Sequence, residues 1–292
     1  MSKTMKPKGL AITMLFESEG ANYGEGIGNI SPLKKITLAD GKEYPYISRQ
    51  AIAFNIVEQM GYELAPVALK GSGNKKVVQF TKDATIDEFV EIDLFGYMKT
   101  EKGDKQNNRT AKVRVSNAIA TDPYMGELDF LTNKGLADRI GSDMNISQSE
   151  IHSSYYRYTI VIDLDQIGVD KEIEIPNKEK AERINRLLDT VLYLYRDIKG
   201  RREDLKPLFV IGGVYDIKNP VFKNMVVVKN NIVDVDMIED VMTEEIKKDT
   251  ICGVARNKFK NDNEIRERLN ATSVTKAFEK LKKKVSEYYE SN

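Results

Sequence analysis

The most restrictive feature of the sequence is a strand–helix–strand unit in its second half. The run "SSYYRYTIVIDLDQIG", residues 153–168, is rich in aromatic and β-branched residues and predicts a buried strand. It leads through Pro176 into residues 177–200, where apolar side chains recur at helical spacing. The run "LKPLFVIGG", residues 205–213, returns as another buried strand. The apolar face of the predicted helix comprises Ile184, Leu187, Leu188, Val191, Tyr195 and Ile198.

A similar order stands in the first half. "GLAITMLF", residues 9–16, predicts a buried strand, and a helix follows with Ser48 as its N-cap and Gly61 at its end. "KKVVQF", "FVEIDLFGYM" and "AKVRVSNAI" are predicted strands, and "MVVVKNNIVDVDM" predicts a hairpin with Asn230 and Asn231 at its turn. A basic helix over 273–289 closes the chain. This order is that of a split βαβ, or ferredoxin-like, sheet, so we expect an α+β fold with one domain over 1–292.

The segment "SEGANYGEGIGN", residues 18–29, carries four glycines directly after the first predicted strand. A dinucleotide fingerprint requires G-x-G-x-x-G opening a helix, but Gly24, Gly26 and Gly28 give G-x-G-x-G and Asn29 follows. No G-K-[S/T] tripeptide for a phosphate-binding P-loop occurs in the chain. The loop therefore either approaches a ligand through its backbone or only makes turns.

Charge is balanced over the chain but polarised along it. Lys+Arg and Asp+Glu both number 45. Residues 99–117 carry six basic and two acidic residues, whereas residues 234–250 carry seven acidic and two basic. Such polarity suits a nucleic-acid face or contacts between copies of the chain, and solvated surface of both signs is the alternative. In the predicted strand at 111–119, Lys112, Arg114 and Ser116 share one face.

Catalytic and metal-binding motifs are sparse. His152 is the single histidine and Cys252 the single cysteine, so we expect no disulfide and no metal or other cofactor. No G-x-S-x-G or H-E-x-x-H motif occurs. His152 fits either a general base in an RNA-cleaving site or a hydrogen-bonded loop residue. With no apolar run near about 20 residues and no signal-peptide segment in "MSKTMKPKG", we expect no membrane contact and a cytoplasmic location.

Four spaced motifs in order carry a family resemblance: "DLFGYM" from Asp93, "RTAKVRVSNAIATDPY" from Arg109, "SSYYRYTIVIDLDQIG" and "PLFVIGG". Together they resemble the DevR-type CRISPR-associated backbone proteins of type I-B Cascade complexes, the Cas family numbered seven. The resemblance spans Gly9 to about Asn261. It implies a modified RRM, or ferredoxin-like, palm with a finger-like insertion at 97–150 and a thumb-like hairpin region at 214–236.

The resemblance also implies a function. Members polymerise along a CRISPR RNA, hold its backbone and present its bases to invading DNA in antiviral defence, without being nucleases. The implied partners are CRISPR RNA, target DNA paired with the guide, copies of the chain, the Cas subunits of families five, six and eight, and the recruited helicase-nuclease. An endoribonuclease, with His152 or Asp40 in its site, is the alternative; a DNA-binding regulator requires a helix-turn-helix that the sequence does not show.

The implied RNA-binding residues come from the glycine loop, the start of the first helix and the basic segment. A helix N-terminus attracts phosphate through free N–H groups and its dipole, and Arg49 adds a guanidinium. The expected RNA contacts are Asn22, Tyr23, Ser48, Arg49, Gln50, Lys99, Lys102, Lys105, Arg109, Lys112, Arg114, Ser116 and Asn117. An apolar thumb tip that wedges between guide bases is expected at Ile217, Pro220, Val221 and Phe222, unless this segment only covers a sheet edge.

Overall fold

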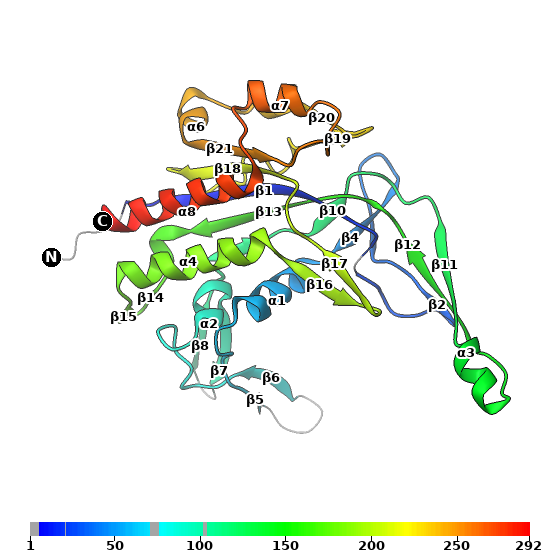
Figure 1. Ribbon diagram of the computed structural model, residues 1–292. Coiled ribbons are helices and arrows are strands. Elements are labelled where there is room, and N and C mark those ends of the chain that lie inside the picture. Colours follow the sequence, from blue (N-terminus) through cyan, green and yellow to red (C-terminus); the bar gives the residue numbers. More distant parts are fainter. Residues whose placement is uncertain (1–5, 21, 71–75, 102–103) are drawn as a thin grey trace.

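An antiparallel β-sheet forms the centre of the molecule (Figure 1). The computed structural model describes residues 6–20, 22–70, 76–101 and 104–292. The strand order is β21-β18-β1-β13-β10-β4-β3, and β9 pairs with β13 next to the stretch that pairs with β10. The strands are β1 (Gly9–Ser18), β3 (Lys35–Thr37), β4 (Glu43–Ile47), β9 (Val113–Val115), β10 (Ala118–Ala120), β13 (Ser154–Asp163), β18 (Phe209–Tyr215) and β21 (Thr250–Val254).

Strand β1 lies between β13 and β18 and is covered on both faces. Its register runs from Gly9 opposite Asp163 to Ser18 opposite Ser154, and it pairs with β18 over residues 9–15. Alternate side chains enter two separate cores, which explains why the sequence of β1 is continuously apolar.

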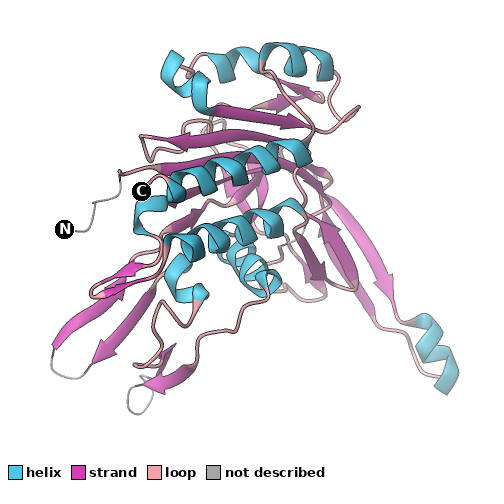
Figure 2. Cartoon of the chain, turned by 60° about the vertical axis from the view of Figure 1, so that its left-hand side comes forward, coloured by secondary structure: helices cyan, strands magenta, loops and turns pink. Residues whose placement is uncertain are grey.

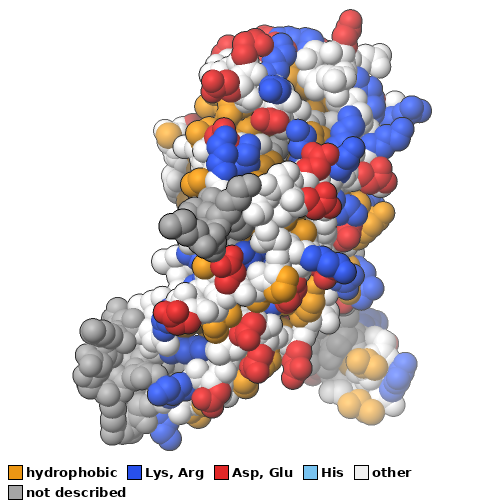
Figure 3. Space-filling model, turned by 90° about the vertical axis from the view of Figure 1, so that its left-hand side faces the viewer, with side chains coloured by type: hydrophobic (Ala, Val, Ile, Leu, Met, Phe, Trp, Pro, Cys, Tyr) orange, Lys and Arg blue, Asp and Glu red, His pale blue; other side chains and the backbone are white. Residues whose placement is uncertain are grey.

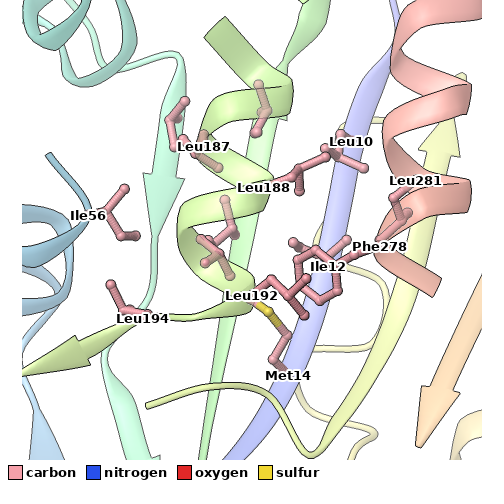
Figure 4. Packing of buried hydrophobic residues seen from close by; sticks show 14 of the residues in the cluster. Leu10, Ile12, Met14, Ile56, Leu187, Leu188, Leu192, Leu194, Phe278 and Leu281 are labelled. Carbon is pink, nitrogen blue, oxygen red and sulfur yellow. The ribbon is translucent and has the colours of Figure 1, made fainter. Parts of the chain in front are cut away.

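The helical face of the sheet holds the larger core. It is covered by α1 (Arg49–Met60), α2 (Val90–Phe95), α4 (Asn177–Leu192) and α8 (Val274–Glu290). The two long helices, α4 and α8, lie side by side on this face of the sheet (Figure 2). Leu10, Ile12 and Met14 of β1 point toward leucines of α4 and toward Phe278 and Leu281 of α8 (Figure 4).

A second layer covers only part of the opposite face. It contains the turn at 221–225, the hairpin β19 (Val228–Lys229) to β20 (Ile232–Val233), α5 (Val235–Glu239), α6 (Glu244–Asp249) and α7 (Asp262–Arg268). Its buried core includes Leu15, Phe209, Phe222 and Val226, and it takes no residue from β4, β9 or β10. The sheet face formed by those three strands is therefore left outside this core.

Several hairpins project from the sheet. They are β5 (Val67–Lys70) with β6 (Val77–Phe80), β7 (Tyr97–Glu101) with β8 (Asp104–Arg109), β14 (Val169–Asp170) with β15 (Ile173–Glu174), and β16 (Tyr195–Ile198) with β17 (Arg201–Asp204). A 3-10 turn, η3 (Leu164–Gln166), follows β13.

The longest projection, here called the arm, comprises residues 127–151 (Figure 1). It consists of β11 (Glu127–Thr132), α3 (Lys134–Ala137), the 3-10 turn η2 (Asp138–Ile140) and β12 (Ile146–Ile151), with β2 (Ile30–Ser31) parallel to β12. All six residues of β11 are exposed. Leu128, Phe130, Leu136 and Ile140 are 50%, 55%, 60% and 81% exposed, so the arm has little core of its own.

The mixed α+β class is confirmed, and so are the first strand, the helix capped by Ser48 and Gly61, and the closing helix. Asn230 and Asn231 form the predicted turn with φ of 52° and 62°. Three predictions are wrong. The predicted single strand at 111–119 is divided into β9 and β10. Residues 90–95 form helix α2, and α4 ends at Leu192, after which Tyr195–Ile198 forms β16.

The predicted boundaries of the insertions also differ from the structure. The interval 97–150 contains the β7–β8 hairpin and nearly all of the arm, but β9 and β10 between them belong to the main sheet. The interval 214–236 contains the short β19–β20 hairpin, in which Val228 is buried, and the buried residues Phe222 and Val226 before it. None of the described helices is long and apolar enough to cross a bilayer.

Candidate nucleic-acid interface

A groove of about 610 Å³ lies on the part of the sheet face that the second layer leaves open. Four separate segments form it: the end of β4 with the start of α1, the strand β9 with the β9–β10 connection, the middle of β13, and the segment between β18 and β19. Among the residues that the structure describes, its lining contains four cationic side chains and no carboxylate. The lining residues are Tyr46, Ser48, Arg49, Gln50, Arg114, Val115, Ser116, Asn117, Thr159, Val161, Lys218, Pro220 and Lys223.

The start of α1 is fixed by side-chain hydrogen bonds. Ser48 Oγ accepts from the backbone N–H of Ala51 at 3.3 Å, and Asn22 Nδ2 donates to the same oxygen at 3.1 Å. Asn117 Oδ1 accepts from the backbone N–H of Arg49 at 2.8 Å. Two N–H groups at the helix start are therefore satisfied within the protein, and the cationic side chains are left as the main anion-binding groups of the groove.

The four groove cations differ in their pairing. Arg114 donates to Asp163 at 2.7 Å, and Lys218 pairs with Asp165. Burial raises the pKa of Asp163, but the hydrogen bond and charge of Arg114 outweigh it and hold the pKa below its ordinary value. Arg49 and Lys223 are exposed and have no carboxylate partner among the described residues. These two side chains carry the uncompensated positive charge of the groove.

The structure brings together six of the expected RNA contacts, namely Ser48, Arg49, Gln50, Arg114, Ser116 and Asn117. Asn22 does not line the groove; its side chain is buried and donates to Ser48 Oγ. Ser116 Oγ accepts from the Thr159 N–H at 2.9 Å, which ties the β9–β10 connection to β13.

Tyr23 and Lys112 do not line the groove. Tyr23 lies under Lys199, whose Nζ is 4.1 Å from the ring centroid, and burial raises the pKa of the phenol. Lys112 lies near Arg114, and burial, followed by the charge of Arg109, lowers its pKa. The glycine loop is held by neighbouring segments, because Glu17 pairs with Lys258 and Glu19 with Arg201 at its start.

The basic segment does not act as one cationic surface, because two of its residues are buried. Lys99 is 3% exposed and donates to the carbonyls of Lys82 and Ala84, and burial lowers its pKa. Arg109 is 6% exposed and pairs with Asp93 at 2.7 Å, beside Arg183, which pairs with the same carboxylate at 2.8 Å.

Lys99 and Arg109 thus hold the β7–β8 hairpin against the domain instead of facing a ligand. Lys102 lies outside the described residues, as does the side chain of Lys105.

The expected wedge residues are divided between surface and core. Ile217 is 46% exposed, Pro220 lines the groove and Val221 packs at the edge of the second core. Phe222 is 2% exposed and buried in that core, so it is not available to insert between bases. This segment forms a wall of the groove and covers the sheet.

Sequence reasoning missed Tyr46, Lys218 and Lys223. Tyr46 had a readable signal, because Pro45 and Ile47 alternate with it and are buried. The two lysines had none, since their proximity to α1 depends on how the segment after β18 crosses the sheet.

The residues of the alternative cleavage site have other contacts. His152 is 6% exposed and its Nε2 lies 3.1 Å from the Asp122 carbonyl oxygen, whereas Asp40 accepts from the Tyr44 hydroxyl at 2.7 Å. The described residues contain no group of three or more His, Cys, Asp or Glu side chains placed to hold a metal ion. The lining of the groove, with its cationic and hydrogen-bonding side chains, can bind an extended polyanion by charge and hydrogen bonds.

Comparison with known proteins places this fold in context. The family model of the CRISPR-associated negative auto-regulator DevR/Csa2 matches residues 10–237. No curated protein matches the sequence. A chain from a solved "CRISPR RNA-guided surveillance complex, pre-nicking" has a similar fold, with a TM-score of 0.54, 13% identity, and coverage of 86% of this chain and 94% of that chain.

A chain from another "CRISPR RNA-guided surveillance complex" gives a TM-score of 0.50 at 15% identity, covering 86% of this chain and 91% of that chain. At these identities the similarity concerns the fold alone. Because the family model spans most of the sequence, from the first strand to the hairpin layer, the chain belongs to the DevR/Csa2 family of CRISPR-associated proteins.

Proposed function

We propose that this protein is the RNA-binding backbone subunit of a type I-B Cascade surveillance complex, a member of the Cas family numbered seven. The observation that carries the proposal is the groove, where Arg49 and Lys223, which have no carboxylate partner in the described part of the chain, come from two separate segments. Two uncompensated cations in a carboxylate-free groove favour a phosphodiester backbone. The structurally similar chains come from RNA-guided surveillance complexes, which supports an RNA guide as that ligand.

The sheet supports a palm of the RRM, or ferredoxin-like, type. Its four central positions run β18, β1, β13 and β10, with α1 in the connection after β1 and α4 in the connection after β13. This is the order expected when two βαβ units interlock in one antiparallel sheet. On this interpretation the β5–β8 hairpins and the arm are elaborations of the palm.

The proposed partners follow from the proposed role. CRISPR RNA lies in the groove, further copies continue along it, and target DNA pairs with the exposed guide bases. Cas subunits of families five, six and eight and the recruited helicase-nuclease complete the cytoplasmic particle. The exposed apolar side chains of the arm are a suitable surface for protein contacts, because soluble monomers rarely expose so many together.

We further propose that the protein is a scaffold and not a nuclease. Buried and hydrogen-bonded, His152 is poorly placed to accept a substrate proton. The test is to purify the protein from cells that express a CRISPR array and to analyse the bound RNA. We expect RNA of uniform length that stays intact on incubation, and loss of this RNA in the Arg49→Ala/Lys223→Ala variant.

Two outcomes contradict the proposal. Absence of RNA from the wild-type preparation removes the RNA-binding role. Cleavage of labelled guide or target RNA that is abolished by His152→Ala or Asp40→Ala replaces the scaffold role with the endoribonuclease alternative.

A further inference from the structure

Aromatic side chains on an open sheet face commonly stack on RNA bases in RRM-type domains. The tyrosines of the strongest strand are not available for this, because Tyr156 and Tyr158 are each 1% exposed and belong to the helical core. Phe16 stacks on Tyr156 with ring centroids 5.6 Å apart. The helical face of the sheet therefore has no accessible stacking position on β13.

Tyr46 lies on the opposite face, at the end of β4. Pro45 and Ile47 are buried, and Ile47 belongs to the helical core, so the side chain of Tyr46 points away from that core. It is partly exposed and is the single aromatic residue of the groove lining among the described residues.

One row of residues across the sheet shows why this position is open. Tyr46 pairs with Ile119, Ile119 with Arg157, and Arg157 with Leu15. Leu15 is covered by the second layer, and Arg157 donates to the Val226 carbonyl at 2.8 Å at the margin of that layer. Ile119 and Tyr46, farther along the row, are not part of the core of that layer, and Tyr46 lines the groove.

We propose that Tyr46 stacks on one base of a single-stranded RNA whose phosphates are held by Arg49 and Lys223. This inference rests on the proposed RNA-binding function and adds a base-contacting residue to it. A cationic groove with an aromatic platform is the arrangement that binds single-stranded nucleic acid with little sequence preference, because every base has a π-face. The base that stacks on Tyr46 is then not available for pairing with target DNA, whereas the other bases remain available.

The test uses single-stranded RNA that carries 2-aminopurine at one position, because stacking on an aromatic ring quenches its fluorescence. The fluorophore is moved along the RNA, and affinity and quenching are measured for the wild type, Tyr46→Phe and Tyr46→Leu. Tyr44→Leu is the matched control, since Tyr44 lies two residues earlier on the same strand, binds Asp40 and does not line the groove.

We expect quenching at a defined position in the wild type and in Tyr46→Phe. Tyr46→Leu should lose the quenching and bind roughly five- to a hundredfold more weakly, the range found for removal of one stacked base contact. Tyr44→Leu should behave like the wild type. An abasic site at the quenched position should weaken wild-type binding but change Tyr46→Leu little, because both changes remove the same contact.

Two outcomes overturn the inference in distinguishable ways. If Tyr46→Leu keeps both affinity and quenching while Arg49→Ala weakens binding, the stacking role is wrong and the RNA-binding function stands. If the wild type does not bind RNA at all, both fail. Melting curves of each variant show whether a loss of binding comes from unfolding, and Tyr46→Phe tests the ring even if Tyr46→Leu is unstable.

Discussion

At the scale of single residues, pairing decides which cations are available to a ligand. On single strands, each cation that contacts a phosphate adds about 0.7 to the slope with which log affinity falls as log salt rises, because binding releases a counterion. Neutralising such a cation removes its share of the slope. We expect Arg49→Ala/Lys223→Ala to flatten this dependence by about 1.4. Each single change should weaken binding about tenfold to a hundredfold for all sequences, as a charge-assisted contact does.

Arg256→Ala is the control for this prediction, since Arg256 is exposed and lies outside the groove. An unchanged salt dependence in the double variant, at unchanged melting temperature, removes the groove from the RNA-binding surface.

Arg109 should show the opposite behaviour. Its guanidinium is buried against Asp93 and the carbonyls of Gln166 and Val169. Breaking a buried ion pair leaves a carboxylate short of compensation, so we expect Arg109→Met to cost about 3 kcal/mol of unfolding free energy. The salt dependence of RNA binding per folded molecule should not change. Denaturant unfolding and binding titrations separate the two effects, and a flattened slope in a stable variant would show that Arg109 reaches the ligand.

At the scale of elements, close strand packing explains the "IGG" sequence of β18. A Cβ added at Gly212 would lie 2.1 Å from the Ala11 carbonyl oxygen of β1, so Gly212→Ala forces the two strands apart. We expect a loss of about 2 kcal/mol or more, measured by urea unfolding. Gly135→Ala in α3 is the matched control: nothing lies within 4 Å of its added Cβ, and stability should stay the same or rise. Equal stability of both variants would contradict the packing argument.

Elements with a complete local signal could be predicted from the sequence. Helix α1 begins at the N-cap Ser48, whose side chain accepts from the Ala51 N–H, and ends at Gly61, which has a φ of 72°. Both residues are recognisable in the sequence. Helix α4 lacks such an end: the apolar spacing continues to Ile198, but the backbone turns at Tyr193 and forms β16. Residues 90–95 alternate like a strand, yet Val90 and Leu94 face the core from one helical turn. Tertiary packing overrides the local pattern in both cases.

At the scale of the whole molecule, the candidate site depends on contacts distant in sequence. Residues 48–50 and 114–117 are expected to contact RNA because the family resemblance implies it, and the helix start at 48–50 and the cationic strand face at Arg114 support that expectation. The sequence could not show that 218–223 crosses the same face, nor that Lys99 and Arg109 turn inward. Charge patterns along a chain do not distinguish a buried cation from an exposed one.

The two signs of charge are interspersed on the side of the molecule shown in Figure 3. The exposed apolar side chains of the arm are the surface that we test for protein contacts. We expect Phe130→Ser/Ile140→Ser to reduce assembly of several copies on a long RNA, measured by sedimentation velocity, without lowering the melting temperature. Ile232→Ser, a change at a 45% exposed isoleucine outside the arm, is the control. Normal assembly of the double variant would exclude these side chains from the contact between copies.

The central position of β1 has a consequence for biosynthesis. Thr13 meets Thr159 across the β1–β13 pair, 146 residues later in the chain, and β18 follows later still. During translation, the apolar strand β1 therefore cannot pair on both edges until β13 and β18 have been synthesised. Such non-local pairing slows folding, because the entropy of closing a long loop is lost before the strand contacts form and stabilise the structure. We therefore expect the nascent chain to keep an apolar strand unpaired on at least one edge until β18 has been translated, and to depend on chaperones that act on emerging polypeptides.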